Sequence, residues 1–190
     1  MISDSELIKE ITAGSHAAME VLVARHYKSI YTYVYRLTGN YHLSCDVTQE
    51  VFIRMIKGLG AYRENGKFIN WLFKIAVNCC RDHCRSNAKQ TSQLQTLSID
   101  LPDDRDNVYD IFCRKTERER IKAALDSLPS LQREVIVLKF YHDLKIKEIA
   151  ELTQASQSTV KSRLREGIAK LKIMLFNDGG DIYEFREDRV

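Results

Sequence analysis

The most basic part of the chain is the segment 158–172, which carries five lysines or arginines and a single acid, Glu166. Lysine and arginine neutralise phosphates, and arginine and amide side chains recognise base edges in the DNA major groove. The polar side chains expected to face outward are Gln157, Ser158, Thr159, Lys161, Ser162, Arg163, Arg165 and Glu166. This composition indicates a helix that reads DNA. The alternative is an amphipathic helix whose charges are only solvated, and the pattern alone leaves the two about even.

Apolar spacing predicts the elements that must present these side chains. In 144–152 the apolar residues fall on one helical face, and from Val160 to Leu175 they recur at steps of three and four. Ser156 or Ser158 is expected to cap the second helix. Two short helices joined by a tight turn form a helix-turn-helix. The turn residue Gln154 adopts a left-handed backbone only at some cost.

The cysteine-rich run at 79–84 invites a metal interpretation. Cys80 and Cys84, or Cys79 and His83, lie four residues apart on one helix and supply two ligands at most per pair. A closed zinc site needs a second pair with suitable spacing, and the sequence offers none. Small buried thiols are therefore preferred, with no metal and no cofactor. A nucleophile-and-base pair, a carboxylate dyad and a phosphate-binding loop are also missing, so no enzyme activity is expected.

Composition favours an all-α protein. The 190 residues include only two prolines and eight glycines among long periodic stretches, and 44% are hydrophobic. No apolar run approaches membrane-spanning length, so membrane insertion is not expected. The net charge of +3 is too small to indicate nucleic acid by itself. The sequence contains five cysteines, an odd number, and its N-terminal residues do not resemble an export signal. Both features indicate reduced thiols and a cytoplasmic location.

The helical pattern divides the chain into two small helical domains joined by a flexible linker. Four helices are expected in 1–86, at 4–12, from about 16 to Gly39, at 43–59 and from 68 to about 84. A polar, acidic stretch at 87–111 is predicted to be the linker. Helices resume near Phe112, and the helix-turn-helix completes the second domain at 112–176. The acidic tail 177–190 is expected to lack fixed structure.

One side of the helix at 43–59 is polar and suits a partner. Asp46, Gln49, Glu50 and Arg54 share this side, where they can pair with a basic or amide-rich helix. A solvated face is the simpler interpretation of these residues taken alone.

Several segments in order resemble the extracytoplasmic-function (ECF, group IV) sigma factors of the sigma-70 family. The segment 18–40 resembles the start of the sigma core, and Asp46 to Phe52 (DVTQEVF) resembles the polymerase-binding signature. Phe68 to Asn78 (FINWLFKIAVN) is similar to the segment that melts and reads the −10 element. Glu148-Ile149-Ala150 with Ser158 to Leu164 (STVKSRL) is similar to the helix-turn-helix that reads the −35 element. The likeness covers nearly the whole chain apart from linker and tail.

The resemblance implies a function, partners and site residues. The chain is expected to bind core RNA polymerase and to direct promoter-specific initiation, with region 2 on the β′ clamp helices and region 4 on the β flap. An anti-sigma protein is a further expected partner. The polymerase-binding residues implied are Asp46, Gln49, Glu50, Phe52 and Arg54. The −10 and melting residues implied are Arg63, Asn65, Lys67, Phe68, Asn70, Trp71, Lys74, Asn78, Arg81 and Arg85.

Within this set the side chains have different expected roles. A flipped base is expected in a pocket made by the loop 63–67 and the following helix. Asn78 is expected to hydrogen-bond base edges, with Lys67, Arg81 and Arg85 on phosphates. Trp71, Phe68 and Phe73 are most simply core residues, because aromatics at helical spacing usually are.

A rival interpretation is a free-standing helix-turn-helix repressor or activator that binds an operator as a dimer. A sensor domain or a dimerisation helix would favour it, and the sequence shows neither. The −10-like segment favours the sigma factor.

Overall fold

The computed structural model describes residues 2–63, 67–87 and 108–176. The N-terminal half contains α1 (Asp4–Thr12), α2 (His16–Thr38), α3 (Tyr41–Gly58), the 3₁₀ turn η1 (Leu59–Ala61) and α4 (Phe68–Asn87). The C-terminal half contains α5 (Val108–Asp126), α6 (Ser130–Ile136), the π-helical turn η2 (Val137–Tyr141), α7 (Ile146–Thr153) and α8 (Gln157–Phe176). No helix among these residues is both long and apolar enough to cross a membrane.

Local signals set most helix ends. Ser3 and Glu6 form a capping box at the start of α1, in which each side chain bonds to the other residue's backbone N–H. Gly39 ends α2 with a left-handed φ of 66°, a conformation that glycine adopts without steric cost. Asn40 then caps α3 by accepting a hydrogen bond from the Leu43 N–H.

The turn between α7 and α8 has the backbone expected from the sequence. Gln154 is the C-cap of α7 with φ 54°, ψ 37°, so a non-glycine residue occupies the left-handed region here. Thr153 is buried, and its hydroxyl donates to the Ile149 carbonyl at 2.7 Å. The hydroxyl is therefore satisfied within α7.

The core of the N-terminal half lies between α2, α3 and α4. Leu22, Ile30, Val47, Val51 and Leu72 are fully buried there. In the C-terminal half α8 crosses close to α6, where Gly167 faces Ile136. A Cβ added at Gly167 would lie 2.5 Å from the Ile136 Cδ1, so a larger residue at this position would require the Ile136 side chain to move.

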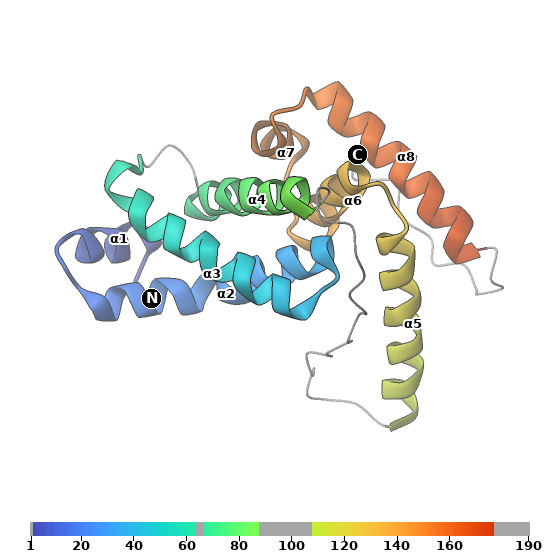
Figure 1. The fold of residues 1–190 in the computed structure, drawn as a ribbon, viewed down its shortest axis with the longest axis horizontal. Helices are drawn as coiled ribbons and strands as arrows, with labels where there is room; N and C mark the ends of the chain where they lie inside the picture. The colour runs from blue at the N-terminus through green and yellow to red at the C-terminus, as the bar shows by residue number, and fades with distance from the viewer. Residues whose placement is uncertain (1, 64–66, 88–107, 177–190) are drawn as a thin grey trace.

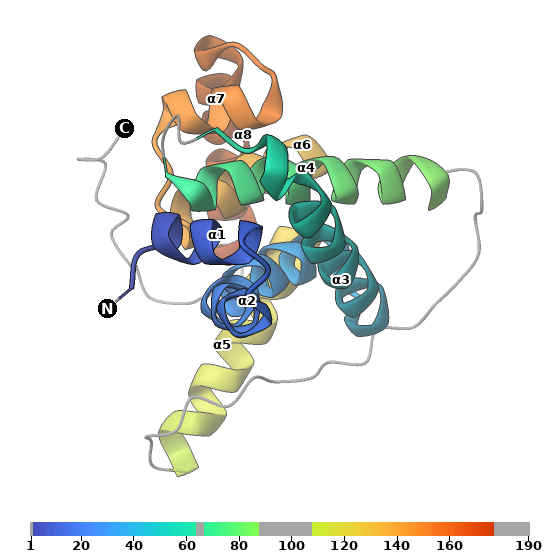
Figure 2. The same ribbon diagram turned by 90° about the vertical axis from the view of Figure 1, so that its left-hand side faces the viewer.

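The two halves pack directly on each other. Their buried residues form one continuous apolar cluster, with α7 against α4 and η2 against α2. Figures 1 and 2 show α7 beside α4, and in Figure 1 α8 runs along the outer edge of the C-terminal half. Tyr33 and Phe73 of the N-terminal half meet His142, with ring centroids 5.8 and 4.6 Å apart respectively.

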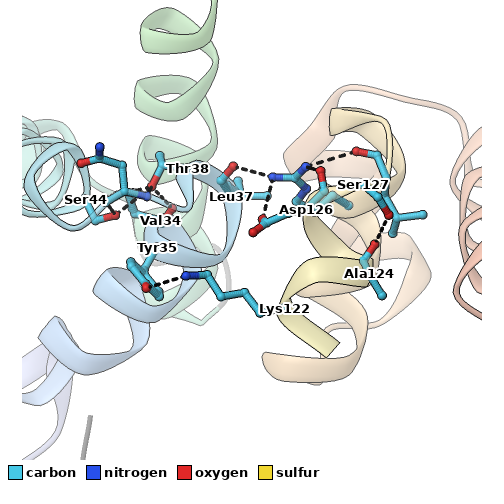
Figure 3. Close-up of polar contacts among 12 residues, drawn as sticks. Val34, Tyr35, Leu37, Thr38, Ser44, Lys122, Ala124, Asp126 and Ser127 are labelled. Carbon is cyan, nitrogen blue, oxygen red and sulfur yellow. Dashed lines mark hydrogen bonds and ion pairs between the residues drawn. The ribbon is translucent and has the colours of Figure 1, made fainter. Parts of the chain in front are cut away.

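A second seam joins the end of α2 to α5 and α6. Lys122 donates to the Tyr35 hydroxyl at 3.1 Å, and Arg133 donates to the Leu37 carbonyl at 3.2 Å. Figure 3 shows Lys122 reaching from α5 to Tyr35 on α2. Arg36 also lies 3.7 Å from the centre of the Tyr141 ring, a favourable cation–π arrangement.

The all-α fold with two helical halves is confirmed, and some predicted boundaries are corrected. Helix α4 extends through Asn87 and α5 begins at Val108, so the predicted linker 87–111 was too wide at both ends. The helix predicted at 131–141 is α6 followed by a π-helical turn. The rest of the predicted linker and the tail 177–190 lie outside the described residues.

Candidate nucleic-acid and partner interfaces

Helix α8 presents most of its predicted DNA-reading side chains to solvent. Ser156 caps it by accepting a hydrogen bond from the Thr159 N–H at 3.0 Å, which selects Ser156 over Ser158 as the cap. The predicted reading side chains are all exposed or half-buried: Gln157, Ser158, Thr159, Lys161, Ser162, Arg163, Arg165 and Glu166. The surface of α8 is thus basic and accessible, as a helix in a major groove requires.

Glu166, also predicted to face DNA, is bonded within the C-terminal half. Its carboxylate accepts from the Ser162 hydroxyl at 2.7 Å and from the Gln132 amide at 2.9 Å. The Ser162 bond, as the largest effect, lowers the pKa of Glu166. Glu166 therefore links α8 to α6. Because its carboxylate oxygens already accept hydrogen bonds, its negative charge acts only in part on the DNA-facing side.

A pocket of about 240 Å³ opens at the start of α4, where the sequence predicts base capture. The wall formed by the N-terminal half of the chain combines three cations, two aromatic rings and an amide, supplied by Tyr62, Arg63, Lys67, Asn70, Trp71 and Lys74. Aromatic faces stack bases and cations hold phosphates, so this wall suits single-stranded nucleic acid. The other wall comes from α7, through Glu148, Glu151 and Leu152.

Packing fixes the aromatic side of the pocket. Tyr62 and Trp71 have ring centroids 4.9 Å apart, and Trp71 covers Gly58, where an added Cβ would lie 3.1 Å from the indole. Phe68 is 5% exposed and lies beneath Trp71, so it supports the pocket from the core. Trp71 is only half-buried and is the more accessible ring.

The remaining predicted −10 residues differ in accessibility. Lys74 and Asn78 are exposed on α4. Asn70 donates to the Glu148 carboxylate at 2.7 Å, and Arg81 is bonded to Glu134. Asn65 lies outside the described residues, as does the side chain of Arg85.

The polar side of α3 is accessible at Asp46 and Gln49. Glu50 instead accepts hydrogen bonds from Arg54 on the same helix and from His83 on α4. The bond from His83, followed by that from Arg54, lowers the pKa of Glu50. Arg54 also pairs with Asp82 at 3.2 Å. Glu50 and Arg54 therefore join α3 to α4 as well as lying beside the exposed face.

Two apolar residues of this face were missed by the sequence reasoning. Ile53 is 44% exposed and Ile56 is 40% exposed. With Asp46 and Gln49 they recur at steps of three, four and three, a spacing that could have revealed a mixed face. Phe52 is only 6% exposed and stacks on Tyr27 at 6.0 Å, so it lies behind the face.

The cysteine run does not gather into a site among the described residues, where no group of three or more metal-ligating side chains occurs. Cys79 and Cys80 are buried, and burial raises the pKa of Cys79 to about 11. A thiol with a raised pKa is a poor nucleophile and a poor metal ligand.

Two family models match the two halves of the chain. The model for Sigma-70 region 2 matches residues 22–90, and that for Sigma-70 region 4 matches residues 118–171. Together they place the protein in the sigma-70 class.

Individual relatives show to which group of the sigma-70 class the protein belongs. The chain is 31% identical to the ECF RNA polymerase sigma factor SigW of Bacillus subtilis over 180 residues, covering 88% of this chain and 94% of SigW. It is 32% identical to the ECF sigma factor SigE of Mycolicibacterium smegmatis over 163 residues, covering 84% of this chain and 63% of SigE. The chain belongs to the ECF RNA polymerase sigma factors.

Solved structures agree with this assignment. CnrH, in complex with the cytosolic domain of CnrY, is 25% identical with a TM-score of 0.68, covering 93% of this chain and 99% of CnrH. The sigma factor RpoE from Bartonella quintana, in complex with the anti-sigma factor NepR, shares the fold at 16% identity with a TM-score of 0.70, covering 84% and 97% of the two chains. The protein thus directs promoter-specific transcription initiation with core RNA polymerase, and the dimeric-repressor alternative is not favoured.

Proposed function

We propose that three surfaces divide the work of initiation. The face of α3 with Asp46, Gln49, Ile53 and Ile56 binds core polymerase, and α8 reads the −35 element. The pocket and exposed face of α4 hold the separated −10 strand. This division follows from which side chains are accessible and from what each can bind.

The composition of the pocket at the start of α4 is the main support for this division of roles. Arg63, Lys67 and Lys74 surround the rings of Tyr62 and Trp71 in a space of about 240 Å³. Stacking on a ring is worth roughly 1–3 kcal/mol per base and needs an unpaired base, so such a pocket favours melted over duplex DNA.

The face of α3 has the mixed character of a protein interface. The exposed apolar side chains of Ile53 and Ile56 adjoin the polar ones of Asp46 and Gln49, and such a combination is common at sites of association. The region 4 half is proposed to contact the β flap. CnrH is solved in complex with the cytosolic domain of CnrY, and RpoE in complex with the anti-sigma factor NepR. These complexes support an anti-sigma partner for this chain.

These roles need no catalytic chemistry from the chain itself. The relatives are sigma factors, and we propose that this protein likewise has no enzymatic activity. Because its proposed partner is core polymerase, we place its activity in the cytoplasm.

Transcription in vitro with core polymerase tests the role of α4. Lys74→Ala and Asn78→Ala are expected to leave closed-complex formation nearly intact and to reduce permanganate reactivity of −10 thymines. A pre-melted bubble template should restore part of the transcript, because the unstacking cost of a few kcal/mol is then already met.

Lys28→Ala is the matched control, since Lys28 is equally exposed but lies on α2. Its opening and transcription should match those of the wild type. Normal strand opening by both α4 variants would exclude a role for this face in melting.

A further inference from the structure

The carboxylate of Glu166 is held in one position on the exposed surface of α8. One of its oxygens accepts a hydrogen bond from the Ser162 hydroxyl at 2.7 Å, and the other accepts one from the Gln132 amide at 2.9 Å. Ser162 lies one turn earlier on α8, whereas Gln132 belongs to α6. A glutamate on a surface ordinarily samples several rotamers, and bonds from two helices restrict this one.

Close packing of α6 on α8 brings Gln132 within reach. Gln132 is only 8% exposed, and Gly167, the neighbour of Glu166, faces it. A Cβ added at Gly167 would lie 3.4 Å from the Gln132 Cβ, so the two helices are already in contact there. The core therefore fixes the Gln132 amide, and this amide fixes a carboxylate that is itself exposed.

Ser162 and Glu166 together offer hydrogen-bond acceptors. The single hydroxyl hydrogen of Ser162 is donated to Glu166, so the Ser162 oxygen can only accept further bonds. The bond from Ser162, followed by that from Gln132, lowers the pKa of Glu166, so its carboxylate is ionised at neutral pH and also only accepts. Each carboxylate oxygen can accept a second hydrogen bond in addition to the one it has.

The charges around Glu166 indicate what it can face on DNA. It is the single acid of the segment 158–172, and the exposed side chains near it include the cations Lys161 and Arg165. Cations of this kind hold phosphates, whereas a carboxylate is repelled by them. An anion on such a helix is therefore least costly against a base edge that donates hydrogen bonds.

The four bases differ in what they present in the major groove. Cytosine presents its N4 amino group as a donor, and adenine presents the N6 amino group beside the acceptor N7. Guanine presents two acceptors, N7 and O6, and thymine presents the acceptor O4 and a methyl group. Two neighbouring acceptors on the protein therefore favour cytosine, tolerate adenine and disfavour guanine and thymine.

We propose that Glu166 is a specificity-determining residue that selects cytosine at one base pair of the −35 element, and that Gln132 is the positioning residue that holds Glu166 for this contact. The inference rests on the role proposed above for α8 as the −35 reader. It names the base that one part of this helix selects. It also gives a buried residue of α6, which does not face DNA, a part in base recognition.

The test measures binding of holoenzyme to promoter duplexes in which each −35 base pair is replaced in turn by the other three. Fluorescence anisotropy competition gives the affinity ratio of the four bases at every position. The variants are Glu166→Ala, Gln132→Met and the double variant. Glu20→Ala is the matched control, because Glu20 is an exposed glutamate of α2.

We expect wild-type and Glu20→Ala holoenzymes to prefer cytosine over guanine and thymine about tenfold at one −35 position. Glu166→Ala should remove this preference at that position alone, and it should bind the disfavoured bases more tightly than the wild type because the repulsion is gone. Gln132→Met should reduce the preference at the same position. The double variant should match Glu166→Ala, since Gln132 acts only through Glu166.

A cytosine preference that survives Glu166→Ala would overturn the proposal, as would a Glu166-dependent preference for another base. Equal losses at every −35 position, with a lower melting temperature, would assign Glu166 to helix packing. Full preference in Gln132→Met would overturn the positioning role. If circular dichroism shows that Gln132→Met is unfolded, Gln132→Asn, which keeps the amide but shortens its reach, is tested by the same criteria.

The same measurements separate this inference from the proposed function. Wild-type holoenzyme that binds all −35 sequences equally would overturn the role of α8 as the reader. A clear −35 preference that Glu166→Ala leaves intact at every position would overturn only the role of Glu166.

Discussion

Arg81 on α4 and Glu134 on α6 form a two-point ion pair across 53 residues of sequence. The Glu134 side chain is 5% exposed and that of Arg81 26% exposed, so the carboxylate depends on this one guanidinium. The pair joins the half of the protein proposed to open DNA to the half proposed to read the −35 element.

Removing one partner of this pair should be costly. Arg81→Met keeps the apolar stem but leaves Glu134 without its cation, and we expect the free energy of unfolding to fall by about 2 kcal/mol, less than for a fully buried pair. In Arg81→Met/Glu134→Leu the loss should be smaller than the sum of the two single losses. Urea unfolding followed by Trp71 fluorescence measures this, and additive losses would show that the pair is not coupled. Arg54→Met breaks a more exposed pair with Glu50 and should cost less than about 1 kcal/mol.

The contact between the halves should weaken in mild acid through His142. Burial, and secondarily Arg36, lowers the pKa of His142 from 6.5 to about 4, so the packed arrangement holds the neutral ring. The stabilisation is complete above pH 6.5 and is lost as the pH falls from 6.5 towards 4. At pH 5.5 the loss is about 1.4 kcal/mol.

Acrylamide quenching of Trp71 should therefore rise between about pH 7.5 and about pH 5.5. His142→Phe keeps a ring against Phe73, 4.6 Å away in the wild type, and should remove most of this rise. An unchanged pH profile in His142→Phe would assign the effect to other groups.

The face of α3 should matter for polymerase binding more than for folding. Asp46→Ala/Gln49→Ala alters exposed side chains and should change the free energy of unfolding by no more than about 0.5 kcal/mol. Affinity for core polymerase should fall much further, and Ile53→Ser should lower it as well. Glu50→Ala should lower the melting temperature more, because Glu50 bonds to both Arg54 and His83. A melting temperature that collapses in Asp46→Ala/Gln49→Ala, with intact polymerase affinity, would make this face structural.

The recognition helix should discriminate bases through its cations. If Arg163 contacts a guanine with two hydrogen bonds, Arg163→Ala should cost about 1–3 kcal/mol and relax specificity at one base pair. If Lys161 contacts a phosphate, Lys161→Ala should weaken binding evenly across sequences and flatten its salt dependence. Holoenzyme binding to −35 variants at several salt concentrations measures both. Transcription unaffected by either change would exclude α8 as the reader.

Local chemistry explains why the helices and the surface of α8 could be predicted from the sequence. The capping box at Ser3, the left-handed Gly39 and the apolar steps of three and four all act within a few residues. Helical spacing likewise separates exposed Asp46 and Gln49 from buried Val47 and Val51 in the motif at 46–52, and it separates the exposed cations from the buried apolar residues in the basic run at 158–172.

Only the tertiary structure determines which residues each helix face contacts. Periodicity marks Phe73 as buried but does not reveal that His142 lies against it, and nothing near Glu134 predicts that Arg81 will neutralise it. Ile56 fits the apolar stripe of its helix, yet it is 40% exposed to solvent. Such contacts join residues separated by 50 or more positions, and their free energy depends on burial and on the charge of a distant partner. The covering of α4 by α7 is of this kind, because complementarity between two surfaces is a property of neither sequence segment alone.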